Sequence, residues 1–296
     1  MLSICIPVYN YDASRLIRTL HKQLVASNVP FEILLIDDAS LPEYREKNRA
    51  CLPPDTVFIQ LEQNIGWTKI RNLLAKKARY PFLVCMDSDS EVPSDTYIAR
   101  YINICRPGIV CFGGRMYEKE MKNSSLSLRW KYGKEREAHI AAHRKKRPNV
   151  CFQAGNFIID KDIFNIVSFN EMLTEYGNED TLFGLELLEH NITVEHIDNP
   201  LIHLGLEDNA GFLKKTESSL INLKQIEHIM KNRNINQADF PRIIRTKRLL
   251  EKFHLKKAAA FLFRISRPAL VRNLCGKKPS LFLFDLYRMG FFCSIN

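Results

Sequence analysis

The sequence predicts an α/β protein in which helices flank a mostly parallel sheet, with a helical, basic tail at the C-terminal end. Three observations predict this arrangement. Strand and helix patterns alternate from residue 2 to residue 112. The strand segments are continuous apolar runs, as in sheets that are covered on both faces. From residue 241 to residue 296 the chain carries thirteen Lys and Arg but only two acids, a net charge of +11.

Two kinds of pattern define the elements along the chain. Strands are expected where short apolar runs, such as FEILLI and FLVCM, stand between turn residues. Helices are expected where apolar residues recur every three or four positions, as Leu16, Leu20 and Leu24 do. The expected strands are residues 2–8, 31–36, 56–61, 82–86, 109–112, 151–159 and 192–197. The expected helices are residues 13–26, 68–78, 181–190 and most of the chain from about 212 onward.

The composition excludes several classes of protein. The chain has 296 residues, of which 46% are hydrophobic, so it can bury a full core and is not disordered. Its net charge is +10, but the first 240 residues hold 30 basic and 31 acidic residues, a net charge of −1. A nucleic-acid-binding body would carry its own basic face. The nearly neutral body therefore argues against a nucleic-acid partner.

The compartment follows from the N-terminal pattern and the cysteines. Residues 1–8 are typical of a strand and not of a secretory signal. No uncharged apolar run reaches the roughly 18 residues that a membrane-spanning helix needs. None of the eight cysteines stands in a CxxC pair, so they are expected to be buried thiols in a reducing compartment and not zinc ligands. The sequence therefore predicts the cytoplasm.

Polar residues follow four of the predicted strands. In parallel α/β sheets the ligand binds at the carboxyl ends of the strands, so chemistry is expected there. The four strand-end segments are residues 7–10, 37–40, 64–67 and 87–89. In the last segment Asp87 and Asp89 point their side chains to the same side and can hold one Mg²⁺ or Mn²⁺. The alternative is that Asp87 caps a turn and Asp89 is solvated.

The strand-end motifs occur together in an order that resembles a known family. They are ICIPVYN (4–10), EILLIDDAS (32–40), NIGW (64–67), RN (71–72) and MDSD (86–89). As a set they resemble family 2 glycosyltransferases of the GT-A fold, over roughly residues 1–210. The resemblance implies a metal-dependent enzyme that moves a sugar from a nucleotide-sugar to an acceptor hydroxyl with inversion. It favours a UDP-sugar as donor, and a hexosyl or N-acetylhexosaminyl group as the one transferred.

The resemblance assigns the nucleotide-binding residues by position. Pro7 and Tyr9 match the loop that packs on the nucleoside. Asp38 matches the carboxylate that binds the base, with Asp37 beside it. Arg71 matches a residue that contacts the base or the pyrophosphate, although an ordinary surface arginine on a helix fits the pattern too.

The metal and sugar contacts are assigned in the same way. Asp87 and Asp89 match the metal-binding pair, and Asp89 is expected to be the direct ligand of Mn²⁺ or Mg²⁺. Asp87 is expected to contact the nucleotide-sugar as well. His203 stands where related enzymes place an additional metal ligand, but a structural histidine is an equal alternative. Gly114 resembles part of a loop at the sugar of the donor. Two amides, in Gln153 and Asn156, resemble acceptor-binding residues.

The segment YGNED (176–180) resembles the family element that opens a helix under the acceptor pocket. An inverting transfer needs a base to take the proton of the acceptor hydroxyl, and a carboxylate within hydrogen-bond reach serves. The resemblance assigns this role to Asp180, with Glu179 on an acceptor hydroxyl. The alternative is simple helix capping, with Asn178 as cap and the two acids in the first turn.

Two charged segments complete the predictions. Residues 115–147 carry eleven Lys and Arg against four Glu, and they are expected to form a lid or a solvated loop. The tail mixes basic and aromatic residues, as helices on anionic membrane surfaces do, although a helical cap packed on the body fits too. We divide the chain into a nucleotide-sugar-binding half (1–112), an acceptor-binding half (113–211) and the tail (212–296).

These predictions place the enzyme on the inner membrane face as a peripheral protein. Its acceptor is expected to be a glycan or a lipid-linked molecule in cell-surface polysaccharide or lipid-linked glycan assembly. The alternative in another functional class is a non-catalytic sugar-nucleotide-binding or membrane-associated partner protein that retains the fold.

Overall fold

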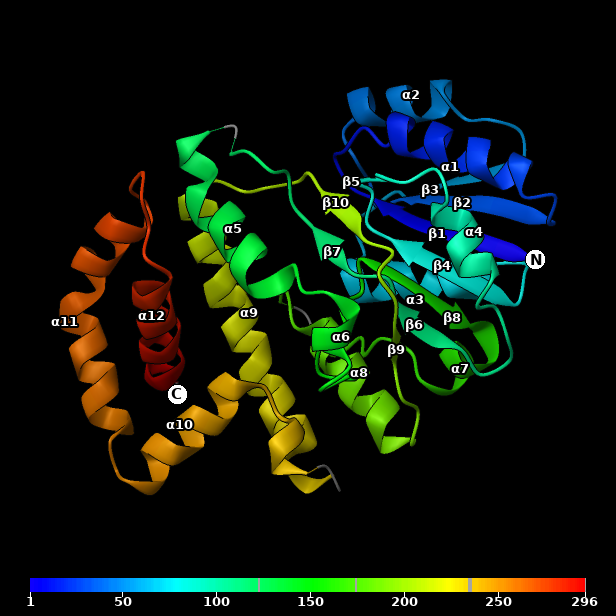
Figure 1. Cartoon of the computed structure of the whole chain (residues 1–296). Coiled ribbons are helices and arrows are strands. Elements are labelled where there is room, and N and C mark those ends of the chain that lie inside the picture. Colours follow the sequence, from blue (N-terminus) through cyan, green and yellow to red (C-terminus); the bar gives the residue numbers. More distant parts are fainter. Residues whose placement is uncertain (122, 174, 234–235, 296) are drawn as a thin grey trace.

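A computed structural model describes residues 1–121, 123–173, 175–233 and 236–295. Among these residues, a sheet of seven strands forms the centre, in the order β3-β2-β1-β4-β8-β6-β9 (Figure 1). Its strands are β1 (Leu2–Val8), β2 (Phe31–Asp37), β3 (Thr56–Gln60), β4 (Phe82–Met86), β6 (Val110–Phe112), β8 (Asn156–Asp160) and β9 (Glu195–His196). β1 pairs parallel with β2 and β4, and β2 with β3, whereas β8 is antiparallel to β4 and β6. The predicted mostly parallel α/β class is confirmed.

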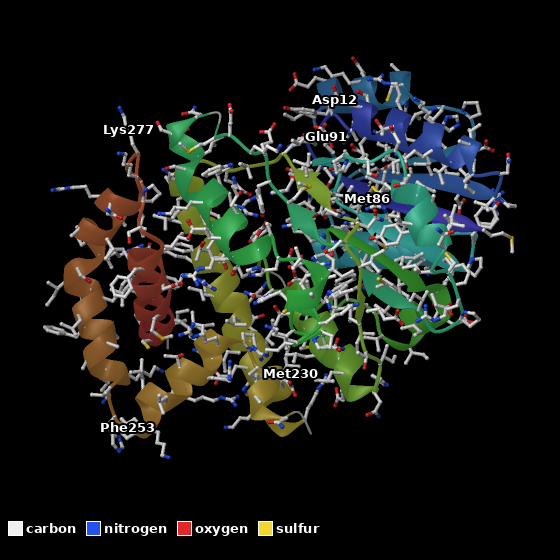
Figure 2. All side chains as sticks on the ribbon, in the orientation of Figure 1. Asp12, Met86, Glu91, Met230, Phe253 and Lys277 are labelled. Atoms are coloured by element: carbon white, nitrogen blue, oxygen red, sulfur yellow. The ribbon has the colours of Figure 1, made fainter. Side chains whose placement is uncertain are left out.

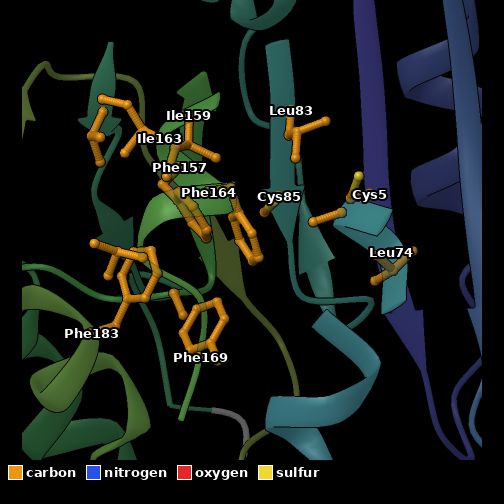
Figure 3. Close-up of a cluster of buried hydrophobic side chains, with 14 of the residues drawn as sticks. Cys5, Leu74, Leu83, Cys85, Phe157, Ile159, Ile163, Phe164, Phe169 and Phe183 are labelled. Carbon is orange, nitrogen blue, oxygen red and sulfur yellow. The ribbon is translucent and has the colours of Figure 1, made fainter. Parts of the chain in front are cut away.

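Helices cover both faces of this sheet and bury separate apolar clusters. On one face lie α1 (Ser14–Ala26) and α4 (Tyr97–Ile102), which bury residues such as Leu20 and Tyr101. On the other lie α3 (Trp67–Lys77), α7 (Lys161–Ile166) and α8 (Glu179–Glu189). Figure 3 shows this second cluster, where Phe169 and Phe183 stack with ring centroids 4.5 Å apart. The strands β1, β6 and β8 are fully buried, and β2 and β4 are buried after their first residue.

A second, smaller sheet joins three segments that are distant in the sequence. It contains β5 (Ser90–Glu91), β10 (Leu201–His203) and β7 (Arg115–Met116), with β10 in the middle. His203 pairs with Ser90, and Leu201 pairs with Arg115. This register places the residue after Asp89 beside His203, and it places Arg115 on the other side of β10.

Several expected elements differ from the observed ones. The strand expected at 151–159 begins only at Asn156, and the strand expected at 192–197 is limited to Glu195–His196. The helices α2 (Pro42–Ala50) and α4 were not expected. α2 has the sequence PEYREKNRA and buries only Asn48, so it carries no apolar periodicity to detect. Asn48 instead fixes α2 by hydrogen bonds to the backbone of Tyr11 and Ala13.

The charged segment 115–147 contains several short helices. They are η1 (Ser124–Leu126), α5 (Ser127–Tyr132), the π-helix η2 (Gly133–Glu137) and α6 (Ala141–Arg144). Leu128 on α5 is buried in one cluster with residues of the tail, and Arg129 is buried beside it. Arg144 reaches the central sheet and donates hydrogen bonds to His196 Nδ1 (3.1 Å) and to the carbonyl of Ile197 (2.6 Å). The interior of this segment is therefore packed on the rest of the protein.

The tail forms a layer of helices beside the body. Its helices are α9 (Asn209–Ile229), η3 (Met230–Asn232), η4 (Gln237–Asp239), α10 (Arg242–Lys252), α11 (Lys256–Leu274) and α12 (Leu281–Ser294). α12 contacts both α9 and α11, and α11 forms the outer edge (Figure 1). Figure 2 shows Phe253 and Lys277 at the two ends of α11, on the opposite side of the molecule from Met86. Within the described residues, no helix is both long enough and apolar enough to cross a membrane.

Candidate active site

Two adjoining cavities open at the carboxyl ends of β1, β2 and β4. The first has a volume of about 430 Å³, and its wall includes Pro7, Tyr9 and Asp38. The second has a volume of about 520 Å³. Its wall includes Arg71, Asp87, Asp89, Arg115, Gln153, Glu179, Asp180 and His203. Four residues line both cavities, namely Tyr9, Trp67, Tyr176 and Glu179. Most of the residues that the sequence predicts for the site thus come together.

In the first cavity, Asp38 is the buried acid that organises the wall. Its two carboxylate oxygens accept hydrogen bonds from the backbone N–H groups of Ile65 (2.7 Å) and Gly66 (3.1 Å). Burial raises the pKa of Asp38, and these two hydrogen bonds oppose the rise. Asp37 was expected to bind nucleotide beside it, but it is fully buried outside the described walls of both cavities. Its carboxylate lies 3.3 Å from Arg45 Nε, so Asp37 supports the loop from within.

Arg71 connects the two halves of the site. One guanidinium nitrogen lies 2.8 Å from Asp87 Oδ1, and another lies 3.1 Å from Glu179 Oε1. The guanidinium carbon is 5.6 Å from the ring centroid of Trp67. Because its side chain is buried, the alternative of a surface arginine is wrong. Arg71 ties the end of β4 to the start of α8.

The carboxylate of Asp87 forms ion pairs with two arginines. Its second oxygen, Oδ2, lies 3.1 Å from Arg115 Nη2, so both oxygens face guanidinium groups. A Cβ atom at Gly155 would collide with Asp87 and Arg115, so glycine allows this close packing. The expectation that Asp87 is a metal ligand therefore does not fit this arrangement. Asp87 orients Arg71 and Arg115 instead.

Asp89 and His203 face each other across the small sheet. Asp89 Oδ1 lies 3.4 Å from His203 Nδ1. Both atoms are buried, and neither has a hydrogen-bond partner among the described residues. Burial opposes the ionisation of Asp89, but His203 and Arg115 lower its pKa below the ordinary value, so it is a carboxylate at neutral pH. A Cβ atom at Gly205 would collide with this carboxylate.

This pair fits a divalent metal that takes its remaining ligands from water and substrate. Mg²⁺ and related ions are commonly bound by one or two protein ligands together with substrate phosphates. Among the described residues, no group of three or more His, Cys, Asp and Glu side chains is arranged to hold a metal. Two unpartnered ligand atoms at one point are therefore the feature that matches such an ion.

Asp180 lies in the first turn of α8, which begins at Glu179. Its Oδ1 accepts a hydrogen bond from the N–H of Thr181 (2.7 Å). Burial and the neighbouring charge of Glu179 raise the pKa of Asp180 to about 7, and the Thr181 N–H, Arg115 and Arg71 limit the rise. Asn178 adopts a left-handed backbone conformation, and its side-chain amide bonds Ser219 rather than capping the helix. The alternative of side-chain capping by Asn178 is therefore wrong.

The predicted sugar-binding residues divide into two groups. Gln153 lines the second cavity, and its side-chain oxygen is buried without a partner in the described part of the chain. Asn156 was expected to bind acceptor, but its amide is buried and bonds Tyr97, Tyr101 and the carbonyls of Gly114 and Asn199. Gly114 is also buried, away from the described cavity walls. Neither Asn156 nor Gly114 is therefore available to ligand in this structure.

Sequence reasoning missed a buried charge network in the second cavity. Glu137 of η2 lies 3.1 Å from Arg129 and 3.8 Å from Arg115, and it bonds the hydroxyl of Tyr117. Burial works against the ionised form, but Arg129 and Arg115 lower the pKa of Glu137 to about 2. Arg115 follows the strand at 110–112 closely, so its place after a strand end was a usable signal. Arg129 and Glu137 lie inside a charged run and carry no such signal.

Comparison with known proteins identifies the fold. The sequence model of "Glycosyl transferase family 2" matches residues 3–167, more than half of the chain. The structure resembles the mannosyltransferase PcManGT from Pyrobaculum calidifontis, solved in complex with GDP-Man and Mn²⁺. That match has a TM-score of 0.59 and 14% identity, and it covers 98% of this chain and 79% of the other.

A further solved structure is similar at a lower score, TarS 1–349 of S. aureus, with a TM-score of 0.49 and 18% identity. This match covers 97% of this chain and 89% of that one. No curated protein sequence matches the chain. The fold is of the GT-A type, and on the strength of the family match the chain belongs to glycosyl transferase family 2.

Proposed function

We propose that this protein is a metal-dependent, inverting glycosyltransferase that moves a hexosyl or N-acetylhexosaminyl group from a nucleotide-sugar, preferably a UDP-sugar, to an acceptor hydroxyl. The observation that carries the proposal is the pairing of Asp180, whose pKa is raised to about 7, with the Asp89–His203 pair in one cavity. A general base works best when its pKa lies near the working pH. PcManGT, which resembles this chain in fold, is complexed with GDP-Man and Mn²⁺.

The proposed reaction assigns a task to each part of the site. The nucleoside occupies the first cavity against Pro7, Tyr9 and Asp38, and the sugar extends into the second. The acceptor oxygen bonds the anomeric carbon as the bond from that carbon to the diphosphate oxygen breaks. Asp180 takes the proton of the acceptor hydroxyl, and the nucleoside diphosphate leaves with the bonding electrons. Attack from the face opposite the leaving group inverts the anomeric centre.

The remaining polar residues position these groups. Glu179, half-buried and paired with Arg71, would bind an acceptor hydroxyl, and Gln153, whose side-chain oxygen has no partner among the described residues, would bind another. Asp89 and His203 would hold Mn²⁺ or Mg²⁺, whose charge stabilises the leaving diphosphate when the ion is bound. The positive charges of Arg115 and Arg71 lower the pKa of Asp180 and so favour its ionised, proton-accepting form.

The tail supports a location at an anionic membrane surface. Eight large apolar side chains of residues 241–296 are exposed, namely Leu249, Phe253, Leu255, Phe261, Leu262, Ile265, Phe282 and Leu286. They are interleaved with most of the thirteen basic residues of 241–296. Basic residues near an anionic bilayer contribute on the order of 1 kcal/mol each, and apolar side chains add burial in the interface. We therefore place the enzyme on the inner membrane face, where it would serve glycan or lipid-linked acceptors.

Ligand-induced thermal stabilisation tests the proposed substrate class. A ligand that binds only the folded protein raises its apparent stability. We expect one set of nucleotide-sugars, UDP- or GDP-linked, to raise Tm in the presence of Mn²⁺, with a smaller shift in EDTA. His203→Ala should abolish the difference between Mn²⁺ and EDTA, whereas His190→Ala, at the far end of α8, should keep it. Equal shifts with and without metal in the wild type would contradict metal dependence.

A further inference from the structure

The outer wall of the second cavity is built by the tail and by the charged segment 115–147. Tyr132 and Arg136 come from α5 and η2, Phe212 and Lys215 from α9, and Phe284 and Arg288 from α12. The tail therefore completes the cavity that holds Asp180. This wall lies beyond the residues that sequence motifs assign to the site, and it has no role in the mechanism above.

Arg136 and Arg288 share one carboxylate at this wall. Arg136 Nη2 lies 3.0 Å from Asp285 Oδ2, and Arg288 Nη1 lies 3.9 Å from Asp285 Oδ1. Asp285 is separated from Arg136 by 149 residues in the sequence, and it stands outside the described lining of the cavity. The two guanidinium groups are thus held close together by an acid behind them. We call Arg136 and Arg288 the arginine pair.

Aromatic rings hold the arginine pair in place. The guanidinium carbon of Arg288 is 5.7 Å from the ring centroids of both Tyr132 and Phe284. Those two rings meet edge to face at 5.3 Å, and Phe284 stacks on Phe212 at 5.5 Å. Because the rings pack on one another, Arg288 is oriented before any ligand binds. Such preorganisation lowers the entropic cost of binding.

The arginine pair differs from the inner arginines in the strength of its present contacts. Arg71 and Arg129 are buried and bond carboxylates that are themselves mostly buried. The side chain of Asp285 is 48% exposed, and an exposed ion pair contributes little. A dianion in the cavity can therefore compete with Asp285 for both guanidinium groups. Two arginine forks are the arrangement that suits phosphate oxygens.

We propose that the arginine pair is a phosphate-binding subsite and that the phosphate it binds belongs to the acceptor. This inference rests on the proposed function. A phosphate in this cavity has two possible sources, the diphosphate of the sugar donor and a phosphate on the acceptor. Neither arginine lines the cavity assigned to the nucleoside, which holds Pro7 and Asp38. Both line only the second cavity, which holds Asp180. The acceptor is therefore the source that the geometry favours.

The two faces of α12 give a second reason to assign the phosphate to the acceptor. Phe284 and Arg288 are four residues apart and face the cavity, whereas Phe282 and Leu286 are 68% and 48% exposed. Residues two apart on a helix point about 200° apart, so α12 carries the subsite on one face and exposed apolar side chains on the opposite face. An acceptor that carries a phosphate between its sugar and an apolar anchor matches both faces.

A titration with a phosphorylated probe tests this subsite. The probe is glycerol 3-phosphate, with glycerol as its neutral counterpart, added to protein saturated with whichever of UDP and GDP binds. Calorimetry should show that glycerol 3-phosphate binds and glycerol does not. The double variant Arg136→Gln/Arg288→Gln should bind the phosphate about tenfold or more weakly. The charge-matched control Arg264→Gln/Arg272→Gln, on exposed positions of α11, should bind within twofold of the wild type.

The outcomes separate the two phosphate sources. Unchanged affinity of the double variant for the nucleoside diphosphate assigns the arginine pair to the acceptor. A tenfold loss of nucleotide affinity would assign it to the sugar donor and overturn the proposal. Equal phosphate binding by the double variant and the control, or no binding to the wild type up to about 20 mM, would also overturn it. A protein that binds neither UDP nor GDP would contradict the proposed function, and titration of the nucleotide-free protein would still test the subsite.

Discussion

At the scale of single residues, the chemistry of the proposed enzyme depends on Asp180. Its carboxylate is half-buried beside Glu179, which raises its pKa to about 7, and two arginines limit that rise. An ordinary aspartate would be a weaker base, because its proton affinity is lower. Burial at the start of α8 therefore converts a common side chain into a base suited to neutral pH.

Replacing Asp180 by Asn should abolish catalysis while sparing binding. The amide keeps the size of the side chain but cannot accept the proton, so we expect kcat to fall by about 10²–10⁴-fold. The affinity for the nucleotide-sugar should stay within a few-fold, because Asp180 lies outside the described lining of the nucleoside cavity. Steady-state kinetics and calorimetry measure the two effects. Glu189→Gln, at the end of the same helix, is the control and should retain activity.

The pH dependence of the reaction should follow the same group. Asp180 acts only when ionised, so kcat/KM should rise about tenfold per pH unit below pH 7 and level off above it. Rates measured from pH 5.5 to pH 8.5 with saturating Mn²⁺ would show this limb. A profile that is flat between pH 5.5 and pH 7 would show that the base is a group with an ordinary carboxylate pKa.

Two of the residues that sequence reasoning placed correctly, Asp38 and Asp89, stand just after strands. They reach the cavities because short apolar runs fix where strands stop and where the next turn lies, whereas Asp180 reaches the second cavity from the first turn of α8. Asn156 and Gly114 were misplaced because burial is a tertiary property. Their polar atoms serve the packing of β6 and β8, and a sequence motif does not show which side of a strand end a side chain takes.

At the scale of elements, the small sheet is the part that the sequence did not predict. β5 and β7 have two residues each and β10 has three, so they carry no detectable periodicity. Yet their pairing brings His203 to Asp89 and Arg115 to Asp87. The longer strands and the helices α1 and α3 were predictable, because their patterns span several turns or a full buried run.

Two substitutions in α12 test whether the tail is packed on the folded body. Phe292 is fully buried against residues of α8 and α9, whereas Phe282 is 68% exposed on the same helix. We expect Phe292→Ala to lower the free energy of unfolding by about 3–5 kcal/mol. Phe282→Ala should change it by less than about 0.5 kcal/mol. Denaturant unfolding measures both, and equal, small effects would mean that α12 is not packed on the body.

At the scale of the whole molecule, charge is divided between two surfaces. Residues 1–240 are nearly neutral and keep many of their carboxylates and arginines paired in the cavities, whereas residues 241–296 have a net charge of +11. The packing of α9 and α12 confirms the helical tail that the sequence predicted, and the exposed apolar face of α11 fits the proposed membrane contact. The tail therefore forms both a wall of the second cavity and an outer surface.

Binding to lipid vesicles tests the outer surface. The triple variant Phe261→Ser/Leu262→Ser/Ile265→Ser removes exposed apolar side chains of α11 without disturbing its buried residues. We expect it to lose most of its binding to vesicles of phosphatidylcholine and phosphatidylserine in a sedimentation assay. Met172→Ser, at a still more exposed position on the body, is the control and should bind normally. Wild-type protein that binds neutral and anionic vesicles equally, or neither, would contradict a basic docking face.

The central claim is that this chain catalyses inverting sugar transfer. Its most direct test follows each nucleotide-sugar with Mn²⁺ and a membrane lipid extract as acceptor source, and measures nucleoside diphosphate release together with the anomeric configuration of the product by NMR. The account predicts release from one nucleotide-sugar, dependent on Asp180, and a product whose anomeric configuration is opposite to that of the donor. A retained configuration would contradict the mechanism. The wild-type protein could instead bind a nucleotide-sugar but release no more nucleoside diphosphate than the Asp180→Asn variant does. That result would identify a non-catalytic binding protein.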